Sequence, residues 1–445
     1  MRSRVVFGVI SLSVLIFVLA VAWLFIASNR LTAARSAVQM PDGTRVQVEG
    51  LTFGKKHTFT KGSPLIAKLR AHAPGPLKDL LPKRFSTTTT MGEEQLLLWY
   101  NRYDPATDTY PNAAVDTFRV IDEHDCVFHV NSYGGGGGAP GYSVSAAHVR
   151  VFPRRQKTFR VRAQSLPVTN IEWTVENPFV TNPPAWIPEP YPATREEDGI
   201  QFTLERIKGH FYASGNWFEP RFKILHGEED RTEWYRPRVE LVDATGNRDS
   251  NRLCPYEPAW KVDVTFYKSH KAPFPAEQIW NVTNLAMPPS GQVTPLTQTT
   301  RLAGISVRLI ALCGSGRFSF SNGVCVASNE LDANSRGGSF SSSSYSGGPN
   351  ARVELSFQYD QPTLVAQIDS IKRSDDLLLR FRDQESRTFA ADFRGSADKT
   401  YLYNVKAPKE FAPTGSRLDL EIIPQSPVRK EYVVAPPRPP RARSN

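Results

Sequence analysis

The chain has 445 residues, of which 40% are hydrophobic and 11% aromatic, so it has enough apolar side chains for packed cores and general disorder is excluded. Its formal net charge of +10 favours acidic partners such as phospholipid head groups or anionic wall polymers, although an inert basic surface explains the charge equally well. Four cysteines are too few for a disulfide scaffold, and we expect no nucleic-acid partner because the sequence contains no recognised binding motif.

An apolar segment near the start organises the chain. Val5 to Ala27 contains 23 residues without a charged side chain. A helix of that length reaches about 34 Å, which is enough to cross a hydrocarbon core of about 30 Å. Residues 1–37 are therefore predicted to form an uncleaved signal-anchor, that is, one transmembrane helix and a short juxtamembrane linker.

Two alternatives concern this segment. Residues 20–22 read Ala-Val-Ala and match a cleavage site, so a cleaved signal is the first alternative, although the apolar run continues through Trp23. Arginines flank the segment on both sides, so the charge rule does not decide its orientation. The short N-terminal flank and the composition favour an extracytoplasmic C-terminal region, and a cytoplasm-facing adaptor is the second alternative.

A strand pattern recurs three times along the chain. GTRVQVEGL begins at Gly43, GIQFTLERI at Gly199 and GISVRLIAL at Gly304, and the three stretches align without gaps. In each, apolar residues at the fourth and sixth positions have the period-two spacing of a half-buried strand. These stretches predict three equivalent strands, each preceded by a glycine.

A turn pattern also recurs three times. In FRVIDEHD, VELVDATG and LRFRDQES, alternating apolar residues precede Asp122, Asp243 and Asp383, which occupy the same place. Asp at the first position of a tight turn accepts hydrogen bonds from the backbone that follows it. Each copy predicts a strand that enters a hairpin at the repeated Asp.

A third pattern closes each copy. VRVF, VDVTF and LDLEI are each followed by a proline-containing corner and an aromatic-x-Val strand, and they begin at Val149, Val262 and Leu418. The order of signals predicts an all-β fold in which three tandem antiparallel sandwich modules of immunoglobulin-like form follow the anchor. The predicted parts are modules at 38–166, 167–288 and 289–436, arranged as a rod, and a disordered Pro/Arg tail at 437–445.

Three insertions vary the copies. Residues 63–85 have a Ser-Pro start and apolar residues on one side, which predicts a short helical insertion in the first module, either capping the sandwich or lying on anionic lipid. The run Gly134–Gly138 and the Ser/Gly-rich stretch 335–350 both predict flexible loops.

The cysteines suggest one local pair. Cys313 and Cys325 flank apolar stretches separated by Gly-rich turns, so a hairpin would bring the thiols together as a candidate disulfide in an oxidising compartment. Cys126 and Cys254 have no partner nearby in the sequence and are expected to be free core residues. We expect no metal site, because there is no Cys-x-x-Cys pair and the eight histidines are dispersed.

Aromatic residues concentrate in the second predicted module. Such rings can stack on sugar rings, and they are equally common as core residues. We take as candidate ligand-binding residues Trp186, Tyr191, Trp217 and Trp234.

No catalytic residues are predicted, because the sequence lacks Gly-x-Ser-x-Gly, His-Glu-x-x-His and an activated cysteine, and no cofactor is implied. Asp243, Asn247 and Asp249 have oxygen-bearing side chains at alternating loop positions, as calcium ligands often do, but the sequence lacks the twelve-residue loop and terminal Glu of an EF-hand, so calcium binding is not favoured. The basic residues from Arg150 to Arg162 either share one charged face or guard an edge strand.

The expected protein is thus a single-pass, membrane-anchored binding or scaffolding protein of the cell envelope, without catalysis. Its expected partners are the membrane, through Val5–Ala27, and an anionic envelope polymer, a glycan or another envelope protein. The alternative is a carbohydrate-active enzyme or glycan-binding protein with its site in the second module.

Overall fold

A computed structural model describes residues 37–439, apart from gaps at 41–42, 63–67, 69, 75–84, 108, 110–116, 140–141, 166–168, 213–214, 232, 322, 328–338, 346–351, 372–373, 398 and 407–415. The predicted anchor Val5–Ala27 and residues 440–445 of the tail lie outside the described residues. In the described part of the chain, no helix is both long and apolar enough to span a membrane. Apart from short helical turns, the regular structure is a set of antiparallel sheets, so the predicted all-β class is confirmed.

The first unit contains two sheets, ordered β1-β2-β3-β7-β6 and β5-β4-β8-β9. Tyr100 and Phe118 connect the two sheets, with ring centroids 4.7 Å apart. The strands are β1 (Val38–Gln39), β2 (Arg45–Lys61), β3 (Phe85–Tyr103), β4 (Thr117–Ile121), β5 (Val127–His129), β6 (Asn131–Ala139), β7 (Tyr142–Val149), β8 (Thr158–Ser165) and β9 (Thr169–Glu176).

The second unit packs two four-stranded sheets, β10-β11-β12-β13 and β15-β14-β16-β30, against each other. Phe202 and Phe266 meet between them with ring centroids 4.9 Å apart, as do Phe218 and Trp260 at 4.7 Å. The strands are β10 (Ala193–Glu197), β11 (Ile200–Tyr212), β12 (Gly215–His226), β13 (Glu229–Asp230), β14 (Trp234–Asp243), β15 (Arg248–Asp249), β16 (Trp260–Lys268) and β30 (Val428–Val434).

The third unit has a nine-stranded sheet, ordered β17-β29-β26-β27-β28-β25-β20-β18 with β19 also paired to β20, and a four-stranded sheet β22-β21-β24-β23. Short 3-10 helices precede β17 and β26, at Ala276–Gln278 and Ser374–Asp376. The strands are β17 (Trp280–Ala286), β18 (Val293–Pro295), β19 (Thr299–Leu302), β20 (Ile305–Cys313), β21 (Gly316–Ser321), β22 (Val324–Ala327), β23 (Ser339–Tyr345), β24 (Arg352–Tyr359), β25 (Thr363–Asp369), β26 (Leu377–Arg382), β27 (Thr388–Ala397), β28 (Thr400–Val405) and β29 (Arg417–Pro424).

The strands are exchanged across the predicted module boundaries. β9 is expected in the second module but pairs with β8 of the first unit. β17 is also expected in the second module but pairs with β29 of the third unit. β30 is expected in the third module but pairs with β16 of the second unit. The third unit is therefore inserted between β16 and β30 of the second, rather than following it in tandem. An alternating pattern predicts that a strand forms, but it does not identify the neighbour with which the strand pairs.

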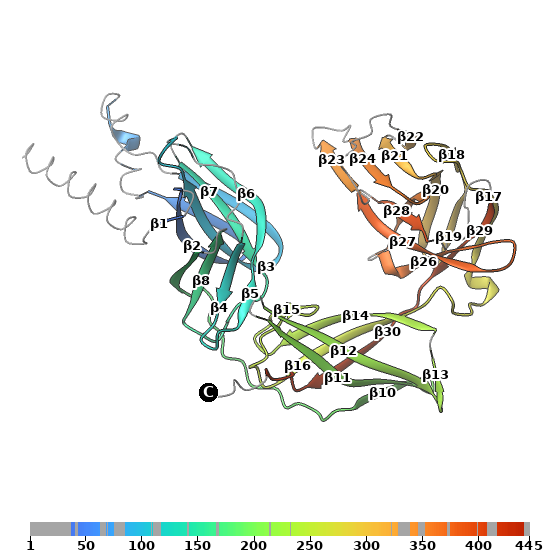
Figure 1. Ribbon diagram of the computed structural model, residues 1–445, viewed down its shortest axis with the longest axis horizontal. Helices are drawn as coiled ribbons and strands as arrows, with labels where there is room; N and C mark the ends of the chain where they lie inside the picture. The colour runs from blue at the N-terminus through green and yellow to red at the C-terminus, as the bar shows by residue number, and fades with distance from the viewer. Residues whose placement is uncertain are drawn as a thin grey trace, which may run out of the picture.

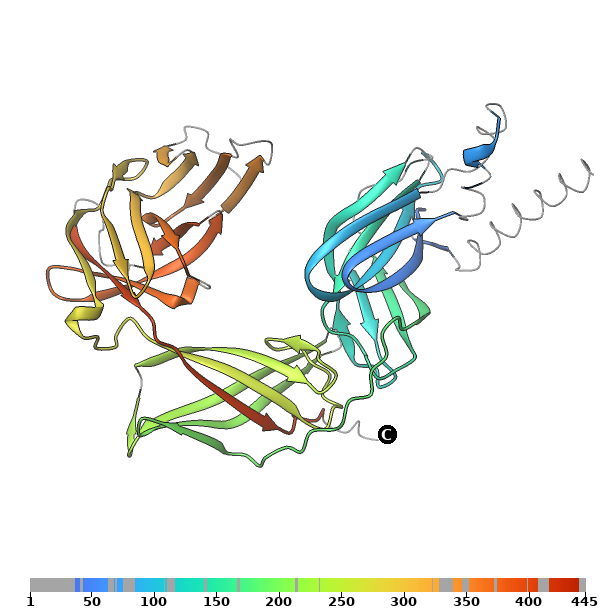
Figure 2. The same ribbon diagram turned by 180° about the vertical axis from the view of Figure 1, so that it is seen from behind.

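The molecule is bent. The first and third units rise from opposite ends of the second, and β30 runs back along the second unit toward the end nearest the first (Figures 1 and 2). The predicted rod is not observed, because the first and third units lie on the same side of the second (Figures 1 and 2).

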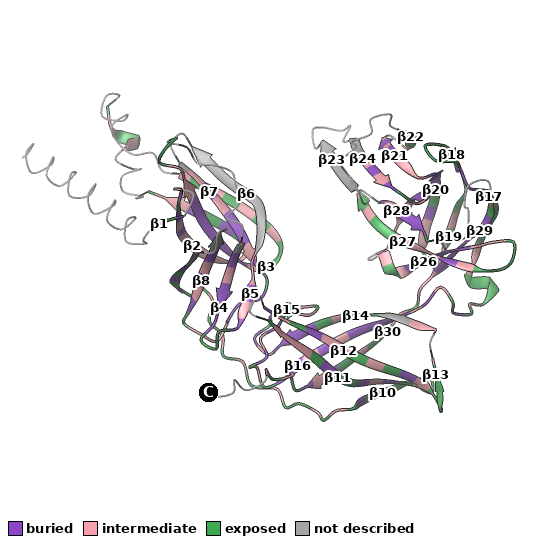
Figure 3. Ribbon diagram, viewed as in Figure 1, coloured by how far each residue is buried: buried purple, intermediate pink, exposed green. Residues whose placement is uncertain are grey.

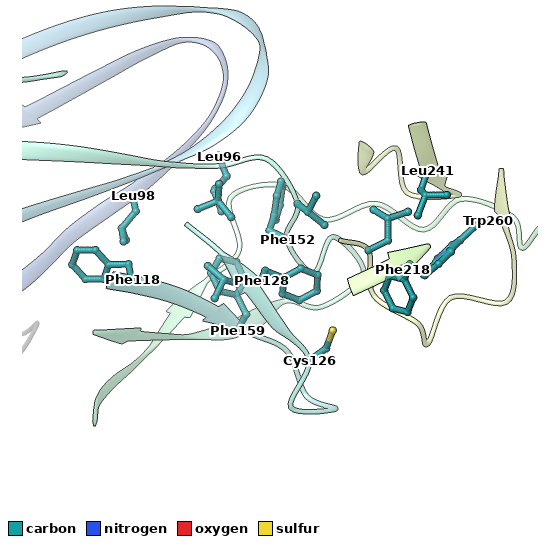
Figure 4. Packing of buried hydrophobic residues seen from close by; sticks show 14 of the residues in the cluster. Leu96, Leu98, Phe118, Cys126, Phe128, Phe152, Phe159, Phe218, Leu241 and Trp260 are labelled. Carbon is teal, nitrogen blue, oxygen red and sulfur yellow. The ribbon is translucent and has the colours of Figure 1, made fainter. Parts of the chain in front are cut away.

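The core is continuous from the first unit into the second. A single cluster of buried residues includes Leu96, Phe128 and Phe152 of the first unit together with Phe218 and Trp260 of the second (Figure 4). Buried positions alternate with intermediate or exposed ones along strands such as β11 and β30, whereas β3 and β20 contain longer buried runs (Figure 3). Because apolar side chains continue through the junction, the first two units pack as one body.

Each of the three repeated glycines precedes a strand and has a left-handed backbone conformation. Gly43, Gly199 and Gly304 have φ values of 84°, 74° and 81°, a conformation that a side chain disfavours. In the first of these turns, Gly43 N–H donates to the carbonyl of Met40 at 2.9 Å. The strands that follow are β2, β11 and β20.

The three repeated aspartates share one turn geometry. Each carboxylate accepts hydrogen bonds from the backbone N–H groups two and four residues later, at 2.8 and 2.8 Å for Asp122, 2.9 and 3.0 Å for Asp243, and 3.0 and 2.8 Å for Asp383. The residue three positions later has positive φ in every copy, namely Asp125, Gly246 and Ser386.

Three local predictions differ from the structure. The run Gly134–Gly138 lies within β6 and not in a loop: glycine has a low preference for strands, and here the pairing of β6 with β7 outweighs that preference. Part of the stretch 335–350 likewise forms β23, which pairs with β24. In VRVF only Val149 belongs to a strand. Of the insertion 63–85, Lys68 and Arg70–His72 are helical, and most of the rest lies outside the described residues.

Candidate binding face on the second unit

The four predicted aromatic residues lie on different parts of the second unit. Trp234 packs edge-on against Phe202 in the core, with ring centroids 5.7 Å apart. Tyr191 donates its hydroxyl hydrogen to the carbonyl of Ala435 at 2.9 Å, which attaches the chain before β10 to the C-terminal segment. The structure does not bring the four rings to one site.

Trp186 and Trp217 are the remaining two. Trp186 lies beside Lys261 of β16, whose Nζ is 5.6 Å from the indole ring. Trp217 lies on β12, is 44% exposed, and points away from the core that its neighbour Phe218 enters. Of the four, Trp217 is the ring presented on the open face of a sheet.

Trp217 belongs to an exposed aromatic group that the sequence does not single out. It faces His210 of β11 in the antiparallel ladder, and the two rings are stacked with centroids 5.6 Å apart. Tyr212, which is 59% exposed, also stacks on His210, with ring centroids 6.2 Å apart. The sequence pattern that could have identified this group is the period-two alternation of β11, which places His210 and Tyr212 on one side of the sheet. The alternation does not show that Trp217 lies beside them, because that depends on the pairing of β11 with β12.

Cations continue this outer face along the two strands. A β-bulge between Leu204 and Arg206 shifts the alternation of β11, so that Arg206 faces Arg221 and Lys208 faces Glu219. We call these outward residues the aromatic–basic face: Arg206, Lys208, His210, Tyr212, Trp217, Arg221 and Lys223.

The aromatic–basic face carries more positive than negative charge. Glu219 also lies on this side of the sheet, opposite Lys208, and forms an ion pair with Arg221 at 3.0 Å. Within the part of the chain that the structure describes, Arg206, Lys208 and Lys223 form no ion pair, and all three are exposed. The face therefore offers positive charge beside stacked rings, which suits a ligand that carries anionic groups on sugar rings.

The longer basic run from Arg150 to Arg162 is not such a surface. Arg154 is half-buried and its guanidinium lies 4.8 Å from the centre of the Phe152 ring, while Arg155 makes two hydrogen bonds to Glu257, at 2.9 and 3.0 Å. Arg160 and Arg162 both pair with Glu172 on the adjacent β9. β8 is flanked by β4 and β9, so it is not an edge strand, and the predicted charged face does not form.

The proposed calcium ligands serve turns instead. Both carboxylate oxygens of Asp243 accept hydrogen bonds from Thr245 and Asn247, and Asp249 accepts them from the N–H groups of Asn251 and Arg252, both at 2.9 Å. The oxygens of Asp243 that a cation would need are therefore already used inside the turn.

The third Asp turn differs in its electrostatics. Burial raises the pKa of Asp383, but the hydrogen bonds and charge of Arg387, with Nε at 2.7 Å, outweigh it, and the pKa is lowered from its ordinary value of 3.8. Because the folded pKa lies below the unfolded one, the turn stabilises the fold above about pH 4 and this contribution is lost as the pH falls through the lowered pKa. Asp383→Asn is expected to flatten the acid limb of a pH–stability curve for the third unit, measured by urea unfolding between pH 2 and pH 6; an unchanged acid limb would contradict it.

Cysteines form two contacting pairs. Cys313 of β20 and Cys325 of β22 are buried, with 3.3 Å between their sulfur atoms. They meet because β22 packs over β20, with β21 between them in sequence. Cys126 and Cys254 also meet, and their sulfur atoms and an oxygen of Asp122 all lie within 4.8 Å of one another. Among the described residues, these three form the one group of His, Cys, Asp or Glu side chains close enough to hold a metal ion.

A cleft of about 910 Å³ lies between the second and third units, with Tyr267 and Tyr403 among its lining residues. Asp392 and Lys406 pair within it at 2.6 Å. The cleft mixes both signs of charge, so it provides less basis for selecting a ligand than the aromatic–basic face.

Comparison of the chain with protein-family models, with curated proteins and with solved structures gave no match.

Proposed function

We propose that this chain is a membrane-anchored, extracytoplasmic, non-enzymatic binding protein of the cell envelope, and that its ligand is an anionic glycan polymer. The proposed anchor is Val5–Ala27, whose 23 uncharged residues match the thickness of a bilayer. The proposed architecture is a set of three immunoglobulin-like sandwich modules, of which the third is inserted into the second.

The aromatic–basic face is the observation that carries the proposal. It combines the exposed rings of Tyr212 and Trp217 with Arg206, Lys208 and Lys223, which are free of ion pairs in the described structure. Sugar rings present apolar C–H faces to aromatic side chains, and carboxylate or phosphate groups on the polymer neutralise the cations. Both features lie along β11 and β12, so an extended polymer contacts them together.

Removal of the exposed rings tests the glycan component. We expect the double variant Tyr212→Ala, Trp217→Ala to bind polygalacturonate, an anionic polysaccharide, about tenfold more weakly than the wild type, which corresponds to about 1.4 kcal/mol. Affinity is measured by biolayer interferometry on the full chain in detergent. The matched control is Phe393→Ala, an exposed ring of the third unit, which is expected to change nothing.

Charge removal tests the anionic component. Arg206→Ala, Lys223→Ala is expected to weaken binding to polygalacturonate and to reduce its dependence on salt. Arg301→Ala, an exposed cation on β19 outside the face, is the control. Binding of neutral dextran with equal affinity, or polygalacturonate binding unaffected by both double variants, would contradict the proposed function.

A further inference from the structure

We propose that Cys126 and Cys254 form a disulfide bond that ties the first unit to the second. The pair is formed by the fold and not by the sequence, since Cys126 follows the Asp122 turn of the first unit and Cys254 lies between β15 and β16 of the second. The inference rests on the proposed extracytoplasmic location, because such bonds persist in oxidising compartments.

The arrangement of all cysteines supports this bond. The chain contains four cysteines, and the structure places them in two contacting pairs, one within the third unit and one across the junction of the first two. The Cys126 and Cys254 sulfur atoms lie within 4.8 Å of each other, and the proposed bond would bring them to about 2.05 Å.

Surrounding groups hold both thiols in place. Cys126 is buried, and Asn216 at the start of β12 donates to its sulfur at 3.5 Å. The Cys254 thiol donates to Oδ2 of Asp122 at 3.3 Å, and the carbonyl of Cys254 accepts from Nε1 of Trp260 at 3.2 Å. The two cysteines therefore meet at a junction whose surrounding groups are already packed and hydrogen-bonded.

A metal ion fits the same residues less well. Structural zinc takes four ligands in a tetrahedron, and this group supplies three. Oδ1 of Asp122 is already held by the N–H groups of His124 and Cys126. The imidazole of His124 is stacked on Tyr256, with ring centroids 4.5 Å apart.

The bond requires an external disulfide donor, such as the disulfide of a thiol–disulfide oxidoreductase. The thiolate of one cysteine attacks the donor disulfide, which forms a mixed disulfide and releases one donor thiol. The thiolate of the other cysteine then attacks the sulfur of the first cysteine in this mixed disulfide and releases the second donor thiol. The two cysteines lose two protons and two electrons, and the donor gains them. Contact with Cys126 and burial both raise the pKa of the Cys254 thiol, so this exchange is favoured during folding, before the junction closes.

The bond would hold in place the start of β12, the strand that carries Trp217 of the aromatic–basic face. Asn216, which contacts Cys126, is adjacent to Trp217 in β12. Gly215, also at this end of β12, lies so near the first unit that a Cβ atom there would be 2.7 Å from Nε2 of His129. A cross-link at this point holds the start of β12 against β5.

Thiol trapping in cells tests the proposal. Cells are lysed directly into urea with N-ethylmaleimide so that buried free thiols are also blocked, and the full chain is purified, digested without reductant and analysed by mass spectrometry. The expected result is a peptide in which Cys126 and Cys254 are joined. Blocked Cys126 and Cys254 would overturn the proposal, as would stoichiometric zinc with thiols that become reactive only after chelation.

The Cys313–Cys325 pair separates failure of this inference from failure of the location. If that pair is joined while Cys126 and Cys254 are blocked, the bond between units is wrong and the oxidising location stands. If all four are blocked, both are wrong. As a second measurement, dithiothreitol is expected to lower the urea midpoint of Cys313→Ser, because that variant keeps Cys126 and Cys254 but cannot form the Cys313–Cys325 bond. The triple variant Cys126→Ser, Cys254→Ser, Cys313→Ser is expected to show no shift; an unchanged midpoint for Cys313→Ser would count against the bond.

Discussion

Replacement of Glu421 by Gln is expected to lower the free energy of unfolding of the third unit by about 3–5 kcal/mol. Glu421 lies on β29 opposite Arg380 of β26, and the two residues are 3% and 5% exposed. Its carboxylate pairs with both Arg380 and Arg382. Gln keeps the size of the side chain but removes its charge, so the buried guanidinium of Arg380 is left without a compensating carboxylate.

The position of Arg380 extends this effect to the connection between units. Its Nη1 donates to the carbonyls of His270 at 2.7 Å and Ala272 at 3.0 Å, in the segment that leads from β16 to β17. Loss of Glu421 frees Arg380 to move, and these bonds weaken with it. Hydrogen exchange read by mass spectrometry is expected to be faster in peptides from β26 and β29 and from residues 269–275.

An exposed ion pair of the second unit gives the matched control. Arg248 and Glu240 are 3.2 Å apart, with side chains 62% and 49% exposed. Pairs in water contribute about 0–1 kcal/mol, so Glu240→Gln is expected to change stability by less than about 1 kcal/mol. Equal losses for Glu421→Gln and Glu240→Gln would show that burial does not determine the contribution of the Arg380 pair.

The local features of this fold are readable from the sequence because each depends on neighbouring residues only. The left-handed conformations of Gly43, Gly199 and Gly304 are local properties of the backbone, and the turns at the repeated aspartates are closed by hydrogen bonds that span no more than four residues. Backbone sterics and turn chemistry act at that range. The same reasoning fails for Gly134–Gly138, whose strand depends on β7 as a partner.

Long-range pairing lies beyond that reasoning. β30 alternates as any half-buried strand does, and nothing in residues 428–434 states that its partner is β16 and not β29. Cys126 and Cys254 illustrate the same point, because their contact depends on how two units pack.

The candidate site could be predicted only in part from the sequence, for a related reason. Trp217 is identified by its type, but whether a tryptophan in an alternating segment faces core or solvent depends on the register. Trp234 has similar surroundings in the sequence and packs inward against Phe202. His210 and Tyr212 gain their meaning from the bulge in β11, which reverses the facing of every later residue.

Replacement of Asp243 by Ala is the second large effect, with an expected loss of about 3–5 kcal/mol from the free energy of unfolding of the second unit. The carboxylate is 1% exposed and accepts four hydrogen bonds, from the N–H groups of Thr245 and Asn247 at 2.9 and 3.0 Å and from their side chains at 2.6 and 2.9 Å. Burial raises its pKa. Alanine leaves these donors buried without an acceptor.

Asn247 transmits the change to the first unit. Its side chain accepts from the N–H of Phe152 at 3.3 Å and donates to the carbonyl of Phe152 at 3.0 Å, and Phe152 belongs to the core that the first two units share. Without Asp243 to hold it, Asn247 loses its fixed orientation. Urea unfolding of Asp243→Ala is expected to show a lower midpoint for both units together.

The repeat supplies the control, because Asp383 makes the same turn in different surroundings. Its backbone donors, Glu385 and Arg387, are exposed, so water replaces the lost carboxylate and Asp383→Ala is expected to cost only about 1 kcal/mol. If Asp243→Ala and Asp383→Ala cost the same, the shape of the turn sets its contribution and burial does not. If Asp243→Ala costs several times more, one turn sequence has acquired two roles, a simple reversal in the third unit and a structural link between the first two.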